Sequence, residues 1–170
     1  MVSEVFFRSV IMPLPSELAM TPDELDNFMK TCVHMRIATF SPGGRINVTP
    51  LVYGWADGKV YTLCRAQKVR KLRRNPNATV IVDRNELYHE LQGAMLQGTA
   101  IVLEDVDAEM NDPYLEEARL QMGEKYSSPS ENGKPPRHSG SASGRTRRWV
   151  VFTPDRVVTW DNTKNSALKG

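Results

Sequence analysis

Cysteine is scarce in this 170-residue chain, which contains only Cys32 and Cys64. Two cysteines cannot build the disulfide framework of a small secreted domain, and this class of protein is therefore excluded. Long hydrophobic runs are also missing, because no stretch approaches the ~20 apolar residues that a membrane-spanning helix needs. No basic segment followed by an apolar core stands near Glu4, so we expect no secretory signal. These absences predict a cytoplasmic protein with reduced thiols and no membrane partner.

The usual signatures of catalysis are absent as well. His34, His89 and His138 are scattered without the spacing of metal ligands, so no metal site is expected. The chain has no glycine-rich phosphate loop of the dinucleotide or P-loop type, and no nucleophile elbow. Neither cysteine has an evident activating neighbour. The sequence therefore identifies no catalytic residue.

Positive charge is concentrated in one segment. The net charge of +2 is too small to indicate a nucleic-acid partner, but residues 65–74 hold six basic side chains and no acidic one. Acidic residues gather instead in residues 104–117. A basic segment on a nearly neutral protein is typical of a specific anionic ligand. The alternative is that these charges form a solvated surface.

Local patterns predict a chain made mainly of strands. The sequence Thr21-Pro22-Asp23-Glu24 is typical of a helix start, with a capping threonine and a glutamate three residues later, and this helix should end near Val33. Further helices are expected at 68–74 and 112–126. Strands are expected at 35–40, 45–55, 59–64, 78–83 and 91–103, the first three as a meander, and at 149–153 and 156–160 as a hairpin around Pro154.

Proline and glycine refine this picture. Pro50 cannot donate a hydrogen bond to a neighbouring strand, so its strand should lie at a sheet edge or be bulged there. Gly93 and Gly98 fall inside one long strand and mark bends, or places where another group approaches the backbone closely. We predict a barrel of six to seven mostly antiparallel strands with a few helices.

The chain length fits a single domain, expected over residues 20–170. Residues 1–19 are expected to form an N-terminal arm, whose apolar side chains either pack on a partner subunit or belong to a mobile leader. Residues 127–147 are rich in serine, glycine, proline and basic residues, which predicts a mobile loop. Its length and the arginines Arg137, Arg145, Arg147 and Arg148 motivate the hypothesis that it folds over the site as a lid.

The segment that begins at Arg65 reads as a strand end that runs into a short helix. Unpaired N–H groups at a helix N-terminus attract anions, and cations there are unfavourable unless an anion lies among them. Arg65 and Lys68 are therefore candidates to hold a phosphate. The solvated surface stays open as the alternative.

Five motifs follow one another in a characteristic order, and a sixth stretch closes the chain. They are Arg36–Gly44, Asn47–Tyr53, Asp57–Thr62, Lys68–Pro76, Tyr88–Gly93 and the closing Thr153–Asp161. In this order the chain resembles the pyridoxamine 5′-phosphate oxidase-like superfamily of FMN-binding split barrels. The branch it resembles most is that of the actinobacterial flavin/deazaflavin oxidoreductases. The resemblance implies a split β-barrel that forms a homodimer, with a cofactor at each subunit interface.

The same resemblance implies a function. It points to an oxidoreductase that transfers hydride between FMN or deazaflavin coenzyme F-420 and a small organic substrate, with the two cofactors left open. A non-catalytic flavin or haem carrier of the same fold is the alternative. Synthesis of pyridoxal phosphate is not expected, because the substrate-phosphate residues of the true oxidases have no match here.

The resemblance also assigns cofactor contacts to individual residues. The ring would lie along the second strand and the phosphate at the start of the short helix, with outer basic residues receiving the acidic tail of F-420. Trp149 either caps the partner's site or belongs to the core. The implied contacts are Asn47, Val48, Thr49, Pro50 and Leu51 on the second strand, Tyr61 and Thr62 on the third, Arg65 and Lys68 at the phosphate, Gln92, Trp149, and Arg70, Lys71, Arg73 and Arg74 for the tail. The family's small hydroxyl residue before the lysine is replaced here by Ala66-Gln67.

Overall fold

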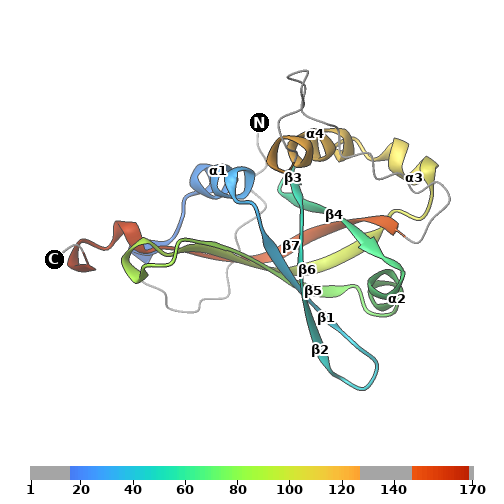
Figure 1. The fold of residues 1–170 in the computed structure, drawn as a ribbon, viewed down its shortest axis with the longest axis horizontal. Helices are drawn as coiled ribbons and strands as arrows, with labels where there is room; N and C mark the ends of the chain where they lie inside the picture. Colours follow the sequence, from blue (N-terminus) through green and yellow to red (C-terminus); the bar gives the residue numbers. More distant parts are fainter. Residues whose placement is uncertain (1–15, 127–146, 169–170) are drawn as a thin grey trace.

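The computed structural model describes residues 16–126 and 147–168 (Figure 1). The helices are α1 (Pro22–Thr31), α2 (Ala66–Arg74), α3 (Val106–Asn111) and α4 (Leu115–Tyr126), with short 3-10 helices at Ser16–Leu18, Tyr88–Glu90, Asn162–Lys164 and Ser166–Leu168. The strands are β1 (Met35–Phe40), β2 (Ile46–Leu51), β3 (Gly54–Ala56), β4 (Lys59–Arg65), β5 (Asn77–Arg84), β6 (Gln92–Val102) and β7 (Arg147–Asp161). The expected arm lies almost wholly outside these residues, as does the expected loop except for Arg147. Within the described part, no helix is both long and apolar enough to cross a membrane.

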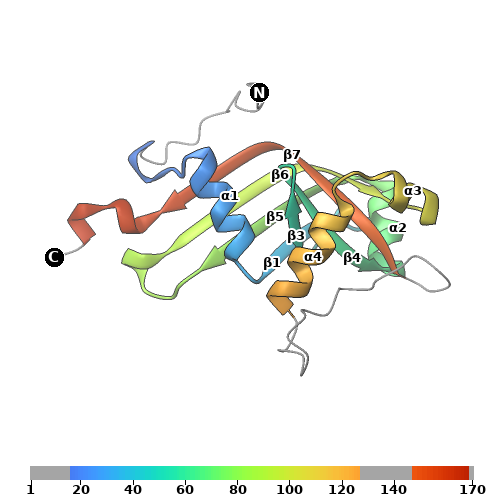
Figure 2. The ribbon, with the colours of Figure 1, turned by 90° about the horizontal axis from the view of Figure 1, so that it is seen from above.

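The strands form one antiparallel sheet in the order β2-β1-β5-β6-β7-β4-β3. Its two edge strands, β2 and β3, are joined by only two residues, Val52 and Tyr53. The sheet must therefore curl until its two edges approach each other. Figure 2 shows α1 and α4 lying across the strands. A hydrogen bond of 2.7 Å from Thr62 Oγ1 to the Val52 carbonyl oxygen ties β4 to this junction. The predicted split barrel is thus confirmed, with seven strands.

Helix α1 begins and packs as its sequence predicts. Thr21 Oγ1 accepts a hydrogen bond from the Glu24 N–H, and Glu24 in turn accepts one from the Thr21 N–H at 2.7 Å. The helix buries Leu25, Phe28 and Met29 against the main core inside the curled sheet. A second buried cluster lies between α4 and the strands β3, β4 and β7, around the fully buried Trp149.

The predicted strand over residues 45–55 is in fact two strands, and the three-strand meander is wrong. β2 pairs with β1, whereas β3 pairs with β4 at the opposite edge of the sheet. The break falls at Val52 and Tyr53, where side-chain hydroxyl groups replace the strand ladder. The Val52 carbonyl accepts from Thr62, and the Tyr53 N–H donates to the Tyr126 hydroxyl oxygen at 3.2 Å. The edge position predicted for Pro50 is confirmed, because β2 is an edge strand.

The predicted hairpin around Pro154 is also wrong, since β7 is one continuous strand that pairs with β6 along its length. Gly98 pairs with Pro154 and Gln97 with Arg156, so Asp155 is the extra residue of a β-bulge. The predicted close approach at both glycines is confirmed. A Cβ atom on Gly98 would lie 2.1 Å from the Thr153 carbonyl oxygen, and one on Gly93 would lie 2.1 Å from the Trp160 ring.

The helix predicted over residues 112–126 is shorter than expected, and a separate helix precedes it. α3 ends at Asn111 and α4 begins at Leu115, on either side of Pro113. A proline disfavours helical backbone in the residue before it, here Asp112, which accordingly is extended. Its carboxylate accepts hydrogen bonds from the Tyr114 N–H at 3.0 Å and from the Tyr61 hydroxyl group at 3.1 Å.

Candidate functional site

A pocket of about 560 Å³ lies where the curled sheet fails to close, between edge strand β2 and the corner at which β4 runs into α2. Its wall on the β2 side is completed by His34 and its wall on the β4 side by the first residue of β7. The lining residues are His34, Asn47, Thr49, Pro50, Leu51, Val52, Leu63, Cys64, Arg65, Gln67, Lys68, Lys71 and Arg147. The pocket thus combines residues that are far apart in the sequence.

Four of the lining side chains are permanent or near-permanent cations, namely Arg65, Lys68, Lys71 and Arg147, and none of the lining residues is acidic. Arg65 and Arg147 are directly paired across β4 and β7. Among the residues that the structure describes, none of the four cations forms an ion pair with a carboxylate. One end of the pocket is therefore strongly positive.

Lys68 reaches across the pocket from α2 to β2. Its Nζ donates a hydrogen bond of 3.0 Å to Thr49 Oγ1, and the Thr49 hydroxyl group lies 3.4 Å from Asn47 Oδ1. Burial lowers the pKa of Lys68; Cys64 opposes this shift, and the nearby charge of Lys71 adds to it. A lowered lysine pKa means that the ammonium is poorly solvated at this place, which favours the binding of an anion beside it.

The N-terminus of α2 faces the same region without a compensating charge. α1, α3 and α4 each carry two acidic residues in their first turn, as the helix dipole favours, but α2 carries none. Arg65 occupies the N-cap position in an extended conformation, and its side chain makes no capping hydrogen bond. The free N–H groups of this first turn therefore add to the attraction for an anion.

The structure brings together six of the eleven side chains that the sequence implied as cofactor contacts. Those that line the pocket are Asn47, Thr49, Pro50, Leu51, Arg65 and Lys68. Val48 lies on the same strand but is not among the lining residues, and its side chain points to the face opposite those of Asn47 and Thr49. It is 59% exposed on the other side of the hairpin.

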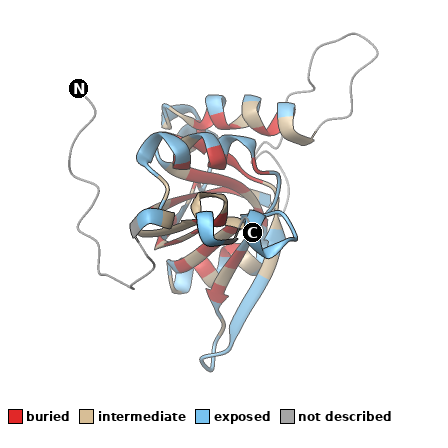
Figure 3. Cartoon of the chain, turned by 90° about the vertical axis from the view of Figure 1, so that its left-hand side faces the viewer, coloured by how far each residue is buried: buried red, intermediate tan, exposed pale blue. Residues whose placement is uncertain are grey.

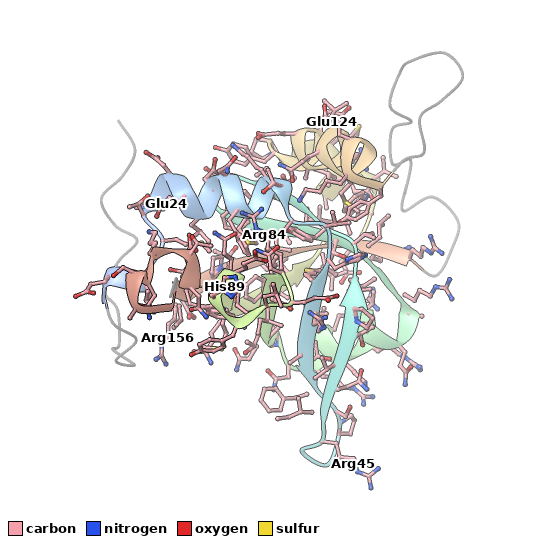
Figure 4. The ribbon with its side chains drawn as sticks, turned by 60° about the vertical axis from the view of Figure 1, so that its left-hand side comes forward. Glu24, Arg45, Arg84, His89, Glu124 and Arg156 are labelled. Atoms are coloured by element: carbon pink, nitrogen blue, oxygen red, sulfur yellow. The ribbon has the colours of Figure 1, made fainter. Side chains whose placement is uncertain are left out.

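The remaining four implied residues lie away from the pocket. Tyr61 and Thr62 are fully buried, and their hydroxyl groups are engaged by Asp112 and by the Val52 carbonyl oxygen. Burial raises the pKa of Tyr61. Gln92 accepts a hydrogen bond of 2.6 Å from Arg84 Nε. Figure 4 shows Arg84 beneath α1, well away from Arg45, which marks the tip of the β1–β2 hairpin.

Trp149 is a core residue, which is the second of the two interpretations that the sequence left open. Its ring is buried in the cluster beneath α4, and the Arg119 guanidinium lies over it at 5.4 Å from the ring centroid. The side chain therefore has no surface to offer a partner subunit.

Sequence reasoning missed several lining residues. Lys71 was expected only as a contact for the acidic tail of F-420, although its spacing of three from Lys68 places both on one helix face. Arg147 was expected only as one of the arginines of a loop over the site, because its position in the pocket wall depends on the pairing of β7 with β4. Of the other outer residues, Arg73 is paired with Glu104, and neither Arg70 nor Arg74 lines the pocket.

Cys64 lies in the pocket wall but is an unreactive thiol. It is 1% exposed, and burial raises its pKa to about 12, although Lys68 acts in the opposite direction. A thiol with so high a pKa is a poor nucleophile at neutral pH. The described residues also contain no cluster of side chains able to hold a metal ion.

Comparison with solved structures identifies the same fold elsewhere. A conserved hypothetical protein of Mycobacterium tuberculosis superimposes with a TM-score of 0.70 at 21% identity, covering 90% of this chain and 92% of its own. The haem storage protein HutZ of Vibrio cholerae gives 0.60 at 16% identity, with 82% and 94% coverage. A structure described as an F420 reductase superimposes with a TM-score of 0.53 at 17% identity, covering 78% of this chain and 94% of its own. At these identities the likeness is one of fold.

Sequence comparison identifies the family to which the chain belongs. No curated protein sequence matches the chain. A family model does match, however, and it covers residues 21–161, which include every strand of the sheet and the whole pocket lining. Together with the split barrel and its cationic cleft, this match shows that the chain belongs to the pyridoxamine 5′-phosphate oxidase family.

Proposed function

We propose that the pocket binds a flavin-type cofactor, FMN or deazaflavin coenzyme F-420, and that the protein is an oxidoreductase. The observation that carries this proposal is the pairing of a cationic end with an apolar wall in one cleft. Arg65, Lys68 and the first turn of α2 would hold the phosphate. Thr49, Pro50 and Leu51 would lie along the ring. A volume of about 560 Å³ is within the range of cofactor sites.

The bound cofactor would supply the hydride chemistry, and the chain would supply binding and orientation. Leu51, Val52 and Leu63 give the apolar part of the wall, against which a flat ring excludes water. Within the described part of the chain, no acidic side chain lines the pocket, so these residues offer the ring no carboxylate base there. A protein whose cofactor supplies the reactive group needs no catalytic side chain of the kinds that the sequence lacks.

A non-catalytic carrier of flavin or haem is the second candidate. His34 lines the pocket, and an imidazole is a common protein ligand of haem iron. The fold likeness to a haem storage protein favours this candidate to the same extent that the likeness to an F420 reductase favours the first. Turnover separates them: repeated oxidation of the bound reduced cofactor by a panel of small organic acceptors supports the oxidoreductase. Tight cofactor binding without any turnover supports the carrier.

The protonation of Lys68 gives a pH dependence. Because burial lowers the pKa of Lys68 in the free pocket, and a bound phosphate raises it again, binding takes up a proton at alkaline pH. The affinity for the cofactor should be highest below the pKa that Lys68 has in the protein without cofactor. Above that pKa it should fall by at most about tenfold per pH unit, until the pKa that Lys68 has in the complex is reached. Titrating the cofactor between pH 7 and 10 measures this decline. Lys68→Arg should bind without the decline, since a guanidinium stays charged; an identical decline in that variant would contradict this assignment.

We also propose that the protein is a homodimer, joined through the outer face of the β1–β2 hairpin. Phe40, Ile46 and Val48 share this face and are 43%, 66% and 59% exposed. Figure 3 shows β2 as an exposed strand. Three large apolar side chains together on one exposed face are typical of an interaction surface. A second copy would cover them and would bring the partner next to the pocket, whose wall includes the same strand.

Val48→Asp tests this dimer, because it places a charge at the centre of the apolar face. We expect the variant to elute as a monomer in size exclusion with light scattering, with an unchanged circular dichroism spectrum. The matched control is Val106→Asp, which alters a valine of 44% exposure at the start of α3. A wild-type monomer, or a dimer that survives in Val48→Asp, would contradict the proposal.

A further inference from the structure

Part of the pocket wall lies beyond the ends of its strands. His34 precedes the first residue of β1, and Val52 follows the last residue of β2, so the ladder between these two strands does not reach either of them. Both residues line the pocket. A backbone segment outside a ladder needs other hydrogen-bond partners for its polar groups. The shape of this part of the wall therefore depends on what those backbone groups bind.

The Tyr126 side chain, at the end of α4, binds both backbone segments. Its hydroxyl group donates a hydrogen bond to the Val33 carbonyl oxygen, which belongs to the peptide group between Val33 and His34. It also accepts a hydrogen bond of 3.2 Å from the Tyr53 N–H, which belongs to the peptide group between Val52 and Tyr53. Burial raises the pKa of Tyr126 to about 12, so the hydroxyl group keeps the proton that it donates. One hydroxyl group therefore links the two segments of the wall.

Helix α4 lies over edge strand β3 (Figure 1), and side chains other than Tyr126 anchor it there. Gln121 takes the place of a strand partner, because its Oε1 accepts from the Trp55 N–H at 2.6 Å and its Nε2 donates to the Trp55 carbonyl oxygen at 3.1 Å. Lys125 Nζ lies 4.0 Å from the centroid of the Tyr53 ring. Loss of the Tyr126 hydroxyl group should therefore release the wall while α4 keeps its place.

We propose that Tyr126 is a positioning residue of the cofactor site, whose hydroxyl group fixes the part of the pocket wall formed by His34 and Val52. This inference rests on the proposed function, which it deepens by naming what holds the surface that receives the ring. Tyr126 is not one of the lining residues, so it acts through the backbone. A wall that is already fixed loses less conformational entropy when the cofactor binds, and the affinity is higher for that reason.

The first measurement compares Tyr126→Phe with Thr159→Val in the full-length protein. The control also loses one hydroxyl group that holds a distant backbone group, because Thr159 Oγ1 accepts from the Met20 N–H at 2.8 Å, but it does so before the start of α1 and away from the pocket. The probe is FMN or coenzyme F-420, whichever binds the wild type more tightly. We expect Tyr126→Phe to weaken binding of this cofactor about five- to tenfold, the effect of one or two lost hydrogen bonds. Thr159→Val should change it less than about twofold, although both variants unfold at a lower urea concentration.

The second measurement is amide hydrogen exchange, followed residue by residue in the protein without cofactor. We expect the Tyr53 N–H to exchange about tenfold faster in Tyr126→Phe, because it has lost its acceptor. The Trp55 N–H, which is bound to Gln121, should keep its wild-type rate.

If a cofactor binds the wild type and Tyr126→Phe equally well, the positioning role is overturned while the proposed function stands. An unchanged exchange rate at Tyr53 also overturns it. So does an equal loss of affinity in Thr159→Val, or equally faster exchange at Trp55, since either result would mean that the substitution acts on the stability of the fold. If neither FMN nor F-420 binds the wild type, both proposals fail.

Discussion

Lys68→Ala should weaken cofactor binding by about 10- to 100-fold, because hydrogen bonds to charged groups contribute about 1.5–3 kcal/mol each. The side chain is half-buried in the pocket and held by Thr49, so its removal takes both a charge and a positioned donor from the phosphate. The dissociation constant can be followed by the change in cofactor fluorescence on binding. The protein's stability should change little, because Lys68 forms no ion pair within the described residues.

Arg74→Ala is the control for this change. Arg74 lies on the same helix and carries the same charge, but it is exposed and outside the pocket lining. Its removal should alter the dissociation constant by less than about threefold, the effect of a screened surface charge. Equal effects of the two variants would mean that the helix attracts the cofactor only through its overall charge, and the assignment of Lys68 would be wrong.

Gly98→Ala should be the most destabilising single-methyl change in the sheet, at about 2–3 kcal/mol of unfolding free energy. A Cβ atom there would lie 2.1 Å from the Thr153 carbonyl oxygen and 2.8 Å from the Pro154 Cα atom. Both obstacles are backbone atoms of the β7 bulge, so no side chain can turn away to make room. The strands β6 and β7 would have to separate where β7 bends. Urea denaturation measures the loss.

Thr99→Ala serves as the comparison for Gly98→Ala. Thr99 is the next residue of β6, and its side chain is exposed, so the loss should stay below about 0.5 kcal/mol. An equal stability of Gly98→Ala and the wild type would show that the bulge is not held tightly at this point.

Local structure was predictable from the sequence wherever neighbouring residues decide it. The capping box of α1, the strand Met35–Phe40 and the close approach at Gly98 all depend on residues near one another or on the missing Cβ atom of glycine. Strand breaks that depend on distant partners were not predictable. The interruption at Val52 and Tyr53 requires hydroxyl groups supplied by β4 and α4. The continuity of β7 across Pro154 requires the full length of β6 beside it.

In the site, too, the residues placed by local structure were predictable, and the residue placed by a distant strand was not. The positions of Lys68 and Arg65 follow from the start of α2, and the alternate residues Asn47, Thr49 and Leu51 follow from the alternation of a strand. Val48 was predicted with them because the resemblance concerns the strand as a whole rather than one of its faces. Arg147 enters the pocket only because β7 pairs with β4, an arrangement that no local pattern encodes.

The central claim is that this cleft holds a flavin-type cofactor by its phosphate. Its most direct test is the visible absorbance of the full-length protein, purified without added ligand from a host that makes both FMN and coenzyme F-420. We expect the spectrum of one of these cofactors, at close to one molecule per chain, and its loss in Lys68→Ala purified in the same way. A colourless wild-type protein that also fails to bind either cofactor when it is added would contradict the claim.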